Sequence, residues 1–303
     1  MRILVTGGSG FVGQRLCRKL IDAGHQVDVV SRSPSQAARV LPRECSTAKS
    51  AMGFVDTPPE AIVNLAGESI AGKRWSDAQK KRLISSRVEA TTALVEFCKA
   101  LKKADKPLPT VMVSGSAMGY YGDQGKKRVD EQTPPHPEFA HRLCAQWEAA
   151  AEPIKALGVR LAIVRIGLVL DEGGGTLAKM LPPFKLGLGG RFGSGEQFMP
   201  WVHRDDLVEA IIYLINRSGL EGPFNAGAPH PVTNREFTRT LAHHLNRPAL
   251  FPVPAFVLKA GLGEMSRLLL TGADMRPDRL HEAGFNFGYP TLDKALADIL
   301  GDD

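Results

Sequence analysis

Three glycines near the start of the chain have the spacing of a phosphate-binding turn. Gly7, Gly10 and Gly13 stand between a short apolar run, Arg2 to Thr6, and a segment of helical periodicity, Phe11 to Ala23. Glycine lets the backbone bend sharply and approach a pyrophosphate, and the free N–H groups at a helix start attract negative charge. We therefore predict a dinucleotide site here, the alternative being a purely structural turn. The residues assigned to it are Gly7, Gly8, Ser9, Gly10, Phe11, Val12 and Gly13.

The end of the second predicted strand, His25 to Val30, indicates which dinucleotide is bound. NAD sites of this kind place a carboxylate there for the ribose 2′-hydroxyl, whereas here Ser31 and Arg32 follow the strand. A guanidinium suits a 2′-phosphate because it offers a planar fork of donors and a permanent charge. Asp28 is the competing candidate, but it lies within the strand rather than at its tip. We therefore expect NADP(H), the alternative for Arg32 being a surface residue in a Ser-Pro loop.

Apolar runs alternate with helical patterns along the first half of the chain. Strand, helix and strand within about 30 residues form a βαβ unit, which requires a right-handed crossover. We predict an α/β fold with a doubly wound parallel sheet, the Rossmann fold. Between Arg32 and Glu60 the pattern is weak and rich in proline, so the second crossover is expected to be short or irregular. Further strands are predicted at 61–65, 110–114 and 160–166, and helices at 76–103 and 139–157.

From Asp171 onward the composition changes to glycine-rich loops and proline-punctuated helices. We expect Met180 to Gly190 to form a mobile lid, since its glycines free the backbone. A strand entering a helix is expected at Trp201 to Asp206, with Asp205 and Asp206 available as caps. The predicted division is a dinucleotide-binding domain at 1–168, rejoined by 198–226, and a small mixed lid or substrate subdomain at 169–197 and 227–303.

Several of these motifs together resemble a known superfamily. The glycine turn, Asn64-Leu-Ala-Gly67, Ser114-Gly-Ser116 and the run Trp201 to Asp206 are similar to extended short-chain dehydrogenases/reductases. More narrowly, Gly119-Tyr-Tyr-Gly-Asp123 and Met180 to Gly190 look like the atypical epimerase family, which is related to nucleotide-sugar epimerases. The likeness covers nearly the whole chain.

The resemblance implies further cofactor contacts. Small residues and backbone groups after the predicted strand at 61–65 would lie against the adenosine half, and backbone after the predicted strand at 160–166 would hold the nicotinamide. Arg87 would steady the strand beneath the cofactor and Arg82 would reach a phosphate, the alternative for both being a basic helix surface. The residues assigned to the cofactor on this ground are Leu65, Ala66, Gly67, Arg82, Arg87, Ser114, Gly167 and Val169.

The chain departs from the superfamily at its usual proton-transfer pair. That chemistry uses Tyr-x-x-x-Lys on one helix face, where the lysine lowers the pKa of the tyrosine. Here Phe139 and Leu143 stand at the corresponding positions. We therefore predict Ser116 and Tyr121 as the catalytic residues.

Other side chains remain alternatives for the missing acid. They are Tyr120, His141 and Arg142, and Glu68 could also face the substrate. In the competing interpretation Tyr120 and Tyr121 line the pocket without taking part in proton transfer. His203 and Asp206 are expected to be structural.

Composition excludes several classes of protein. The 303 residues include 38 Lys and Arg against 32 Asp and Glu, a formal net charge of +6 that is too moderate to indicate nucleic-acid binding without interleaved aromatics. Four widely spaced cysteines suggest neither a zinc site nor a disulfide framework. No apolar run reaches the roughly 20 residues of a membrane helix, and the first strand leaves no room for a leader. We expect a cytoplasmic protein with no metal, nucleic acid or membrane partner.

These observations favour an NADP(H)-dependent oxidoreductase or epimerase-like enzyme. Its expected substrate is a small polar molecule, nucleotide-linked compounds included. The alternatives are an NADPH-binding regulator or sensor without turnover, which the missing Tyr/Lys pair would explain, and a scaffold with a vestigial glycine turn. The resemblance also implies a homodimer built through a four-helix interface, with a monomer as the alternative.

Overall fold

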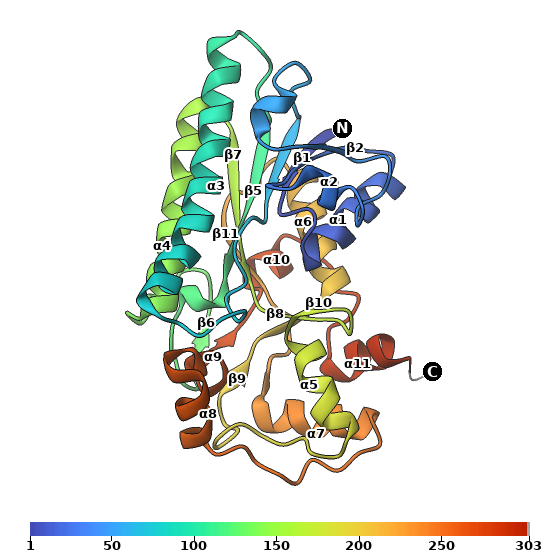
Figure 1. Cartoon of the computed structure of the whole chain (residues 1–303), viewed down its shortest axis with the longest axis vertical. Coiled ribbons are helices and arrows are strands. Elements are labelled where there is room, and N and C mark those ends of the chain that lie inside the picture. The colour runs from blue at the N-terminus through green and yellow to red at the C-terminus, as the bar shows by residue number, and fades with distance from the viewer. Residues whose placement is uncertain (302–303) are drawn as a thin grey trace.

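A parallel β-sheet organises the structure, a computed structural model that describes residues 1–301 (Figure 1). Within this range seven strands form the sheet, and every pair in it is parallel. The predicted α/β Rossmann fold is thus confirmed. From one edge to the other the strands are β11 (Gly222–Ala226), β7 (Arg160–Ile166), β5 (Val111–Ala117), β4 (Ala61–Asn64), β1 (Arg2–Thr6), β2 (Gln26–Val30) and β3 (Ser46–Ala48).

Helices cover both faces of the sheet. On one face, α1 (Phe11–Asp22) packs against β1 and β2, and α6 (Arg204–Asn216) lies beside it over β5 and β7; on the other face lie α3 (Asp77–Lys103) and α4 (Phe139–Ala151) (Figure 1). The central strands β4 and β5 begin as apolar runs because both faces of the sheet are buried, as is usual for parallel sheets, and carry polar residues only toward their carboxyl ends. This sandwich fixes the carboxyl ends of the strands, where doubly wound folds bind their ligands.

The second crossover is short, as the weak sequence pattern predicts. The connection from β2 to β3 contains a four-residue helix, α2 (Pro34–Ala37), and a 3₁₀ turn, η1 (Ala51–Phe54), follows β3. Two predicted boundaries differ from the observed ones by more than one residue. Strand β5 runs on to Ala117, and α4 ends at Ala151 and continues as the 3₁₀ segment η3 (Glu152–Leu157). Proline at the second position of η3 lacks the N–H that would continue the α-helical pattern.

A second lobe lies beyond the carboxyl ends of the strands. Its core surrounds Trp201 and Phe237, against which α5 (Gly175–Lys185), α7 (Asn234–His244) and α11 (Leu292–Leu300) pack. Its remaining elements, with the short strands and turns that join it to the sheet, are η2 (Met118–Tyr120), β6 (Arg128–Val129), β8 (Leu168–Leu170), β9 (Phe198–Met199), β10 (Trp201–His203), β12 (Val232–Thr233), α8 (Ala255–Leu262), η4 (Gly263–Ser266), α9 (Arg267–Leu270), β13 (Asp274–Met275) and α10 (Asp278–Glu282).

The segment expected to be a mobile lid is partly helical. Leu177, Met180, Leu181 and Phe184 are all buried and follow the i, i+3, i+4, i+7 spacing of one helix face. They hold α5 against the lobe, so the first half of Met180 to Gly190 is packed helix and its glycines begin only at Gly187.

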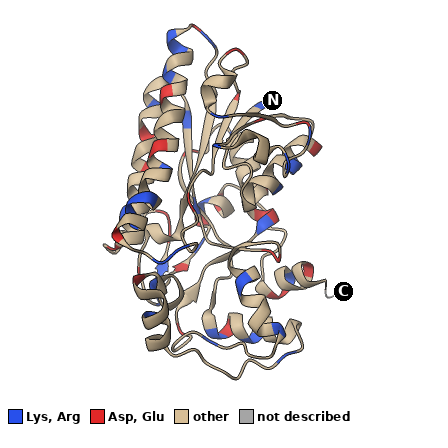
Figure 2. Ribbon diagram, in the orientation of Figure 1, with Lys and Arg blue, Asp and Glu red and all other residues tan. Residues whose placement is uncertain are grey.

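Charges of both signs are mixed over the molecule. Lys and Arg alternate with Asp and Glu along the long helix α3 (Figure 2), which is the pattern of a solvated face. None of the helices within residues 1–301 combines the length and apolar character needed to cross a membrane.

Candidate functional site

The glycine turn between β1 and α1 has no room for side chains. Gly7 has a positive φ of 70°, and a Cβ there would lie 2.5 Å from the carbonyl oxygen of Leu65. A Cβ on Gly13 would lie 2.2 Å from the carbonyl oxygen of Gly7. The Gly10 N–H donates to that same oxygen at 2.9 Å. Backbone atoms therefore contact one another throughout the turn. This leaves no side chain between the turn and a ligand that approaches it closely.

The start of α1 is suited to an anion. Gly10 is its N-cap, no side chain accepts a hydrogen bond there, and the first turn carries no acidic residue. The N–H groups of that turn and the positive end of the helix dipole are thus left for a negatively charged group. Together with the closed glycine turn, this geometry fits the pyrophosphate of a dinucleotide.

At the tip of β2 the structure separates the two candidate recognition residues. Asp28 is buried inside the sheet and its carboxylate accepts from Arg2 Nη1 at 2.9 Å. It is therefore committed to an ion pair and stays within the strand, as the sequence indicates. Ser31 and Arg32 follow the strand, and Arg32 is exposed. A cation, and no free carboxylate, lies at this tip.

Leu65, Ala66 and Gly67 follow β4 and border the glycine turn. A Cβ on Gly7 would collide with the backbone of Leu65 and Ala66. The segment after β4 therefore lies beside the predicted adenosine site. Arg87 steadies the segment from α3, because its Nη2 donates to the carbonyl of Glu68 at 3.0 Å. Its Nη1 donates to Leu83 O at 2.9 Å.

The environment of Arg87 is unusual for a cation. Its guanidinium lies over the Trp147 ring at 5.1 Å, and its Nε is buried without a hydrogen-bond partner. Burial lowers the pKa of this arginine. An unpartnered donor at the edge of the cleft fits a ligand that supplies an acceptor. Arg82, in contrast, is exposed on the outer part of α3.

Ser114 does not reach the cleft. Its hydroxyl accepts from Asn64 Nδ2 at 3.2 Å, while Asn64 also donates to Thr91 and accepts from Thr6 at 2.7 Å. All four side chains are buried within the sheet and under α3. The assignment of Ser114 to the cofactor is corrected on this point: its hydroxyl ties β4 and β5 together beneath the site.

The two predicted catalytic hydroxyls belong to a second buried network. Ser116 donates to Glu148 Oε1 at 2.6 Å, and Arg165 binds both oxygens of Glu148 at 2.9 and 3.0 Å. Tyr121 donates to Asn225 Oδ1 at 2.7 Å and accepts from Arg165 Nη1 at 3.0 Å.

This network keeps Ser116 and Tyr121 out of the pocket. Ser116 is 1% exposed and Tyr121 0%, and burial raises the pKa of Tyr121 to about 12. The expectation that these hydroxyls face the substrate is therefore corrected. Arg165 is the physical reason, because a buried cation on β7 must collect acceptors from the neighbouring elements.

Two of the alternatives for the missing acid, His141 and Glu68, are engaged elsewhere. His141 Nδ1 lies 2.8 Å from the carbonyl oxygen of Tyr120, and Glu68 accepts from Gln79 Nε2 at 2.9 Å. Arg142 is exposed on α4. Cys144 does reach the pocket, but burial raises the pKa of its thiol to about 12. It is therefore a thiol, not a thiolate.

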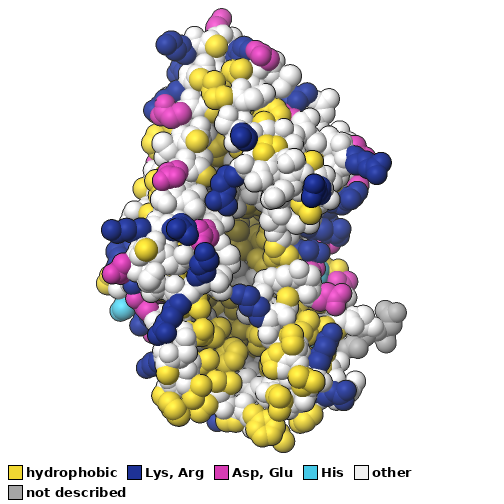
Figure 3. All heavy atoms as spheres, in the orientation of Figure 1, with side chains coloured by type: hydrophobic (Ala, Val, Ile, Leu, Met, Phe, Trp, Pro, Cys, Tyr) yellow, Lys and Arg dark blue, Asp and Glu magenta, His cyan; other side chains and the backbone are white. Residues whose placement is uncertain are grey.

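A cavity of about 590 Å³ opens beside these elements, and its apolar lining is visible in the groove of Figure 3. Phe139 and Leu143 form part of its wall, so the positions of the missing Tyr/Lys pair do face the cleft. Gly167 lies on the opposite side, where a Cβ would stand 2.6 Å from the Pro200 carbonyl oxygen. Val169 lies two residues further, packed against the main core.

Several pocket residues escaped the sequence analysis. They come from the loop before α3, from the middle of α4 and from the distant C-terminal segment, and include Trp75, Trp147, Met265 and Leu268. No spacing in the sequence joins them, since only the fold brings the C-terminal segment against α3 and α4. The lining does not match the expected small polar substrate.

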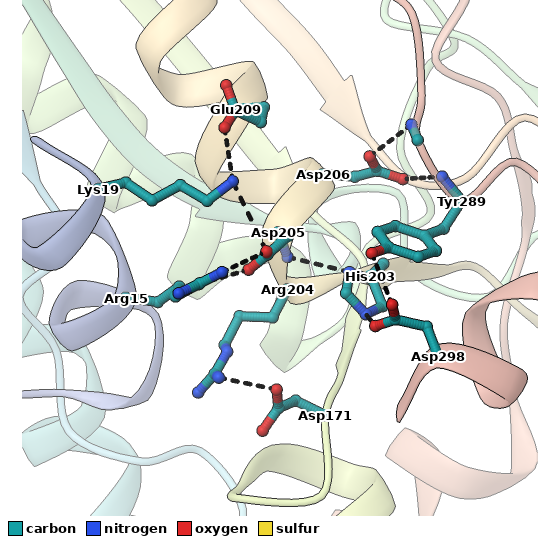
Figure 4. A network of polar contacts seen from close by, with 11 residues as sticks. Arg15, Lys19, Asp171, His203, Arg204, Asp205, Asp206, Glu209, Tyr289 and Asp298 are labelled. Atoms are coloured by element: carbon teal, nitrogen blue, oxygen red, sulfur yellow. Dashed lines mark hydrogen bonds and ion pairs between the residues drawn. The ribbon is translucent and has the colours of Figure 1, made fainter. Parts of the chain in front are cut away.

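Residues at the junction of β10 and α6 contact both α1 and the second lobe, as shown in Figure 4. His203, not Asp205 or Asp206, is the N-cap of α6, and its Nδ1 accepts from the Asp205 N–H at 3.2 Å. Asp205 accepts from Arg15 on α1 in two hydrogen bonds of 2.6 Å. Asp206 accepts from the backbone of Gly288 and Tyr289 at 2.7 and 2.9 Å. The expected structural role of His203 and Asp206 agrees with these contacts.

Fold and site together define a dinucleotide-binding protein of the Rossmann class. The NAD dependent epimerase/dehydratase family model matches residues 3–227, and a domain of unknown function, DUF1731, matches residues 253–299. The chain belongs to the NAD dependent epimerase/dehydratase family.

Individual relatives extend over the whole chain. The human epimerase family protein SDR39U1 is 38% identical, with 99% of this chain and 100% of that protein covered. YfhF of Bacillus subtilis, also an epimerase family protein, is 34% identical over 100% of this chain and 99% of its own length. A crystal structure of human SDR39U1 (isoform 2) with NADPH superimposes with a TM-score of 0.87 at 34% identity and covers 100% of both chains. The UDP-glucose 4-epimerase of Thermus thermophilus, solved with NAD, shares the fold at 19% identity, with a TM-score of 0.79 over 99% and 98% of the two chains.

Proposed function

We propose that this protein is an NADP(H)-dependent oxidoreductase or epimerase-like enzyme. The observation that carries the cofactor choice is the tip of β2, where Arg32 is exposed while Asp28 is held inside the sheet by Arg2. A 2′-phosphate requires a cation at this tip, and a ribose 2′-hydroxyl is normally bound there by a carboxylate. The NADPH-bound structure of the human relative supports the same choice.

Each part of the cleft has a definite task in such an enzyme. The glycine turn and the start of α1 would hold the pyrophosphate, and Arg32 the 2′-phosphate. Arg87 fixes the segment after β4, and Gly167 permits backbone to approach the reacting end of the cofactor. When bound, NADPH supplies a hydride. The apolar wall around Phe139 excludes water from the place where that hydride would move.

Calorimetry with ligand-free protein tests the cofactor assignment. We expect NADPH to bind at least about tenfold more tightly than NADH, which is about 1.4 kcal/mol. Arg32→Ala should remove this preference by weakening NADPH and leaving NADH unchanged. Arg239→Ala, which removes the same charge from an exposed position of α7 in the other lobe, is the control. An unchanged preference in Arg32→Ala would refute the assignment, and no heat from either dinucleotide would refute the proposed function.

A second candidate function is an NADPH-binding regulator without turnover. Phe139 and Leu143 favour it, because both face the cleft and neither can exchange a proton. Loss of NADPH absorbance with any member of a panel of carbonyl compounds and nucleotide sugars would establish the enzyme. Tight NADPH binding with no oxidation across the panel would favour the regulator. The cytoplasmic location and the homodimer stay predictions.

A further inference from the structure

The cleft beyond the dinucleotide turn is walled mainly by apolar side chains. On one side the Trp75 and Phe139 rings meet edge to face with centroids 4.8 Å apart, and Leu143 lies in the same cluster. Met265 and Leu268, from the C-terminal segment, pack against that cluster from the other side. Cavities of this size, about 590 Å³, hold ligands of drug-like size.

Most charged groups on the wall are already paired, and the Nε of Arg87 is the exception. Glu138 accepts from Arg267 Nε at 2.9 Å, and Glu264 pairs with Lys80. Lys179 donates to the Ala71 carbonyl at 3.0 Å. A diphosphate placed here would find one unpaired donor, Arg87 Nε, and would have to break existing contacts to gain a second cation. Its charge would also lie near the carboxylates of Glu138 and Glu264.

The residues at the positions of the proton-transfer pair also make the cavity less suited to a polar ligand. Where the superfamily pattern has a hydroxyl and an ammonium, this chain has the Phe139 ring and the Leu143 side chain, both on the cavity wall. A polar ligand would lose water there without gaining hydrogen bonds from these two side chains, which is unfavourable. An apolar ligand gains free energy in proportion to the apolar surface that it buries.

We propose that this pocket binds an uncharged, apolar, ring-bearing molecule as its substrate or effector, and not a nucleotide sugar. The inference rests on the proposed function for the position of the cofactor. The aromatic edge of Trp75 and Phe139 provides a surface against which a flat ring packs. The C-terminal segment from α8 to α9, joined to α3 and α4 by the Lys80–Glu264 and Arg267–Glu138 pairs, closes the cavity over it.

The probe for this test is N-phenyl-1-naphthylamine, an uncharged dye that fluoresces in apolar sites. It is titrated into the full chain with NADP⁺ present, and UDP-glucose is then added as a competitor. We expect saturable binding of one dye per chain and no displacement by UDP-glucose.

Two variants place a charge on different walls. Leu268→Asp changes a residue of α9, and Ile70→Asp changes a residue of the loop before α3. The dye binding measured for Ile70→Asp therefore does not depend on whether α9 remains folded. Each should weaken dye binding at least about tenfold. Val257→Asp introduces the same charge on the exposed face of neighbouring α8, at a residue that is 46% exposed, and should leave dye binding unchanged.

The two proposals fail in different ways. Displacement of the dye by UDP-glucose, or dye binding that neither Leu268→Asp nor Ile70→Asp weakens, would overturn the apolar site. Dye binding that responds to both variants, in a protein to which NADPH does not bind, would overturn the proposed function and support the pocket assignment.

Discussion

The carbonyl oxygen of Gly7 occupies the space into which a side chain on Gly13 would project, with 2.2 Å between that oxygen and a Cβ at position 13. Gly13→Ala must therefore shift the turn. We expect at least about a tenfold loss of NADPH affinity by calorimetry, with an overpacking cost of about 1–3 kcal/mol in stability. Gly219→Ala is the control, because a Cβ there meets no atom within 4 Å. Unchanged NADPH affinity in Gly13→Ala would show that the dinucleotide does not approach this turn.

Tyr121 should behave as a structural residue. Tyr121→Phe removes a hydroxyl that Asn225 and Arg165 both use, so we expect the free energy of unfolding in urea to fall by about 1–3 kcal/mol. NADPH affinity should not change. Tyr120→Phe keeps its ring over the Arg165 guanidinium, 3.4 Å from the ring centroid, and should stay within about 0.5 kcal/mol of wild type. A specific loss of turnover at full stability in Tyr121→Phe would restore it as a catalytic residue.

Arg165 and Glu148 form a buried ion pair whose partners depend on each other. Arg165→Met leaves the Glu148 carboxylate without its cation, and we expect a loss of about 3–5 kcal/mol. The double variant Arg165→Met/Glu148→Leu should be more stable than Arg165→Met, because no charge is then buried alone. Urea unfolding of the four proteins in a double-mutant cycle measures the coupling. Additive effects would mean that the pair is not energetically linked.

His203 should make stability depend on pH. Burial lowers its pKa, although the carboxylates of Asp298, Asp205, Asp206 and Asp171 oppose this. The unfolded chain, with a histidine pKa of about 6.5, then binds the proton more readily than the folded one. This contribution is fully present above about pH 6.5 and is lost as pH falls toward the folded pKa.

The variant His203→Asn keeps an acceptor at the N-cap of α6 and removes the titration. Its free energy of unfolding should fall less than that of wild type between about pH 7 and about pH 5. Denaturant unfolding at several pH values measures the difference. An identical slope in the two proteins would show that His203 does not titrate in this range.

Local spacing accounts for the parts of the protein that were predicted well. The run Arg2 to Thr6, the glycines at 7, 10 and 13 and the helix after them are contiguous, and their contacts lie within one βαβ unit. The same holds for Ser31 and Arg32, which follow β2 directly. The spacing of Leu177, Met180, Leu181 and Phe184 is also that of one helix face. The nearby prolines and glycines favour a mobile loop instead, and the sequence therefore does not predict this helix.

The sequence by itself determined the fold class, the glycine turn and the cation after β2, because these depend on residues close together in the chain. Only the tertiary structure decided where Ser116 and Tyr121 point, since the buried charge of Arg165, on β7, draws both into a network that spans four elements. It also decided the chemistry of the pocket. Trp75 and Leu268 are nearly 200 residues apart, and the packing of the C-terminal segment against α3 and α4 is what makes them one apolar surface.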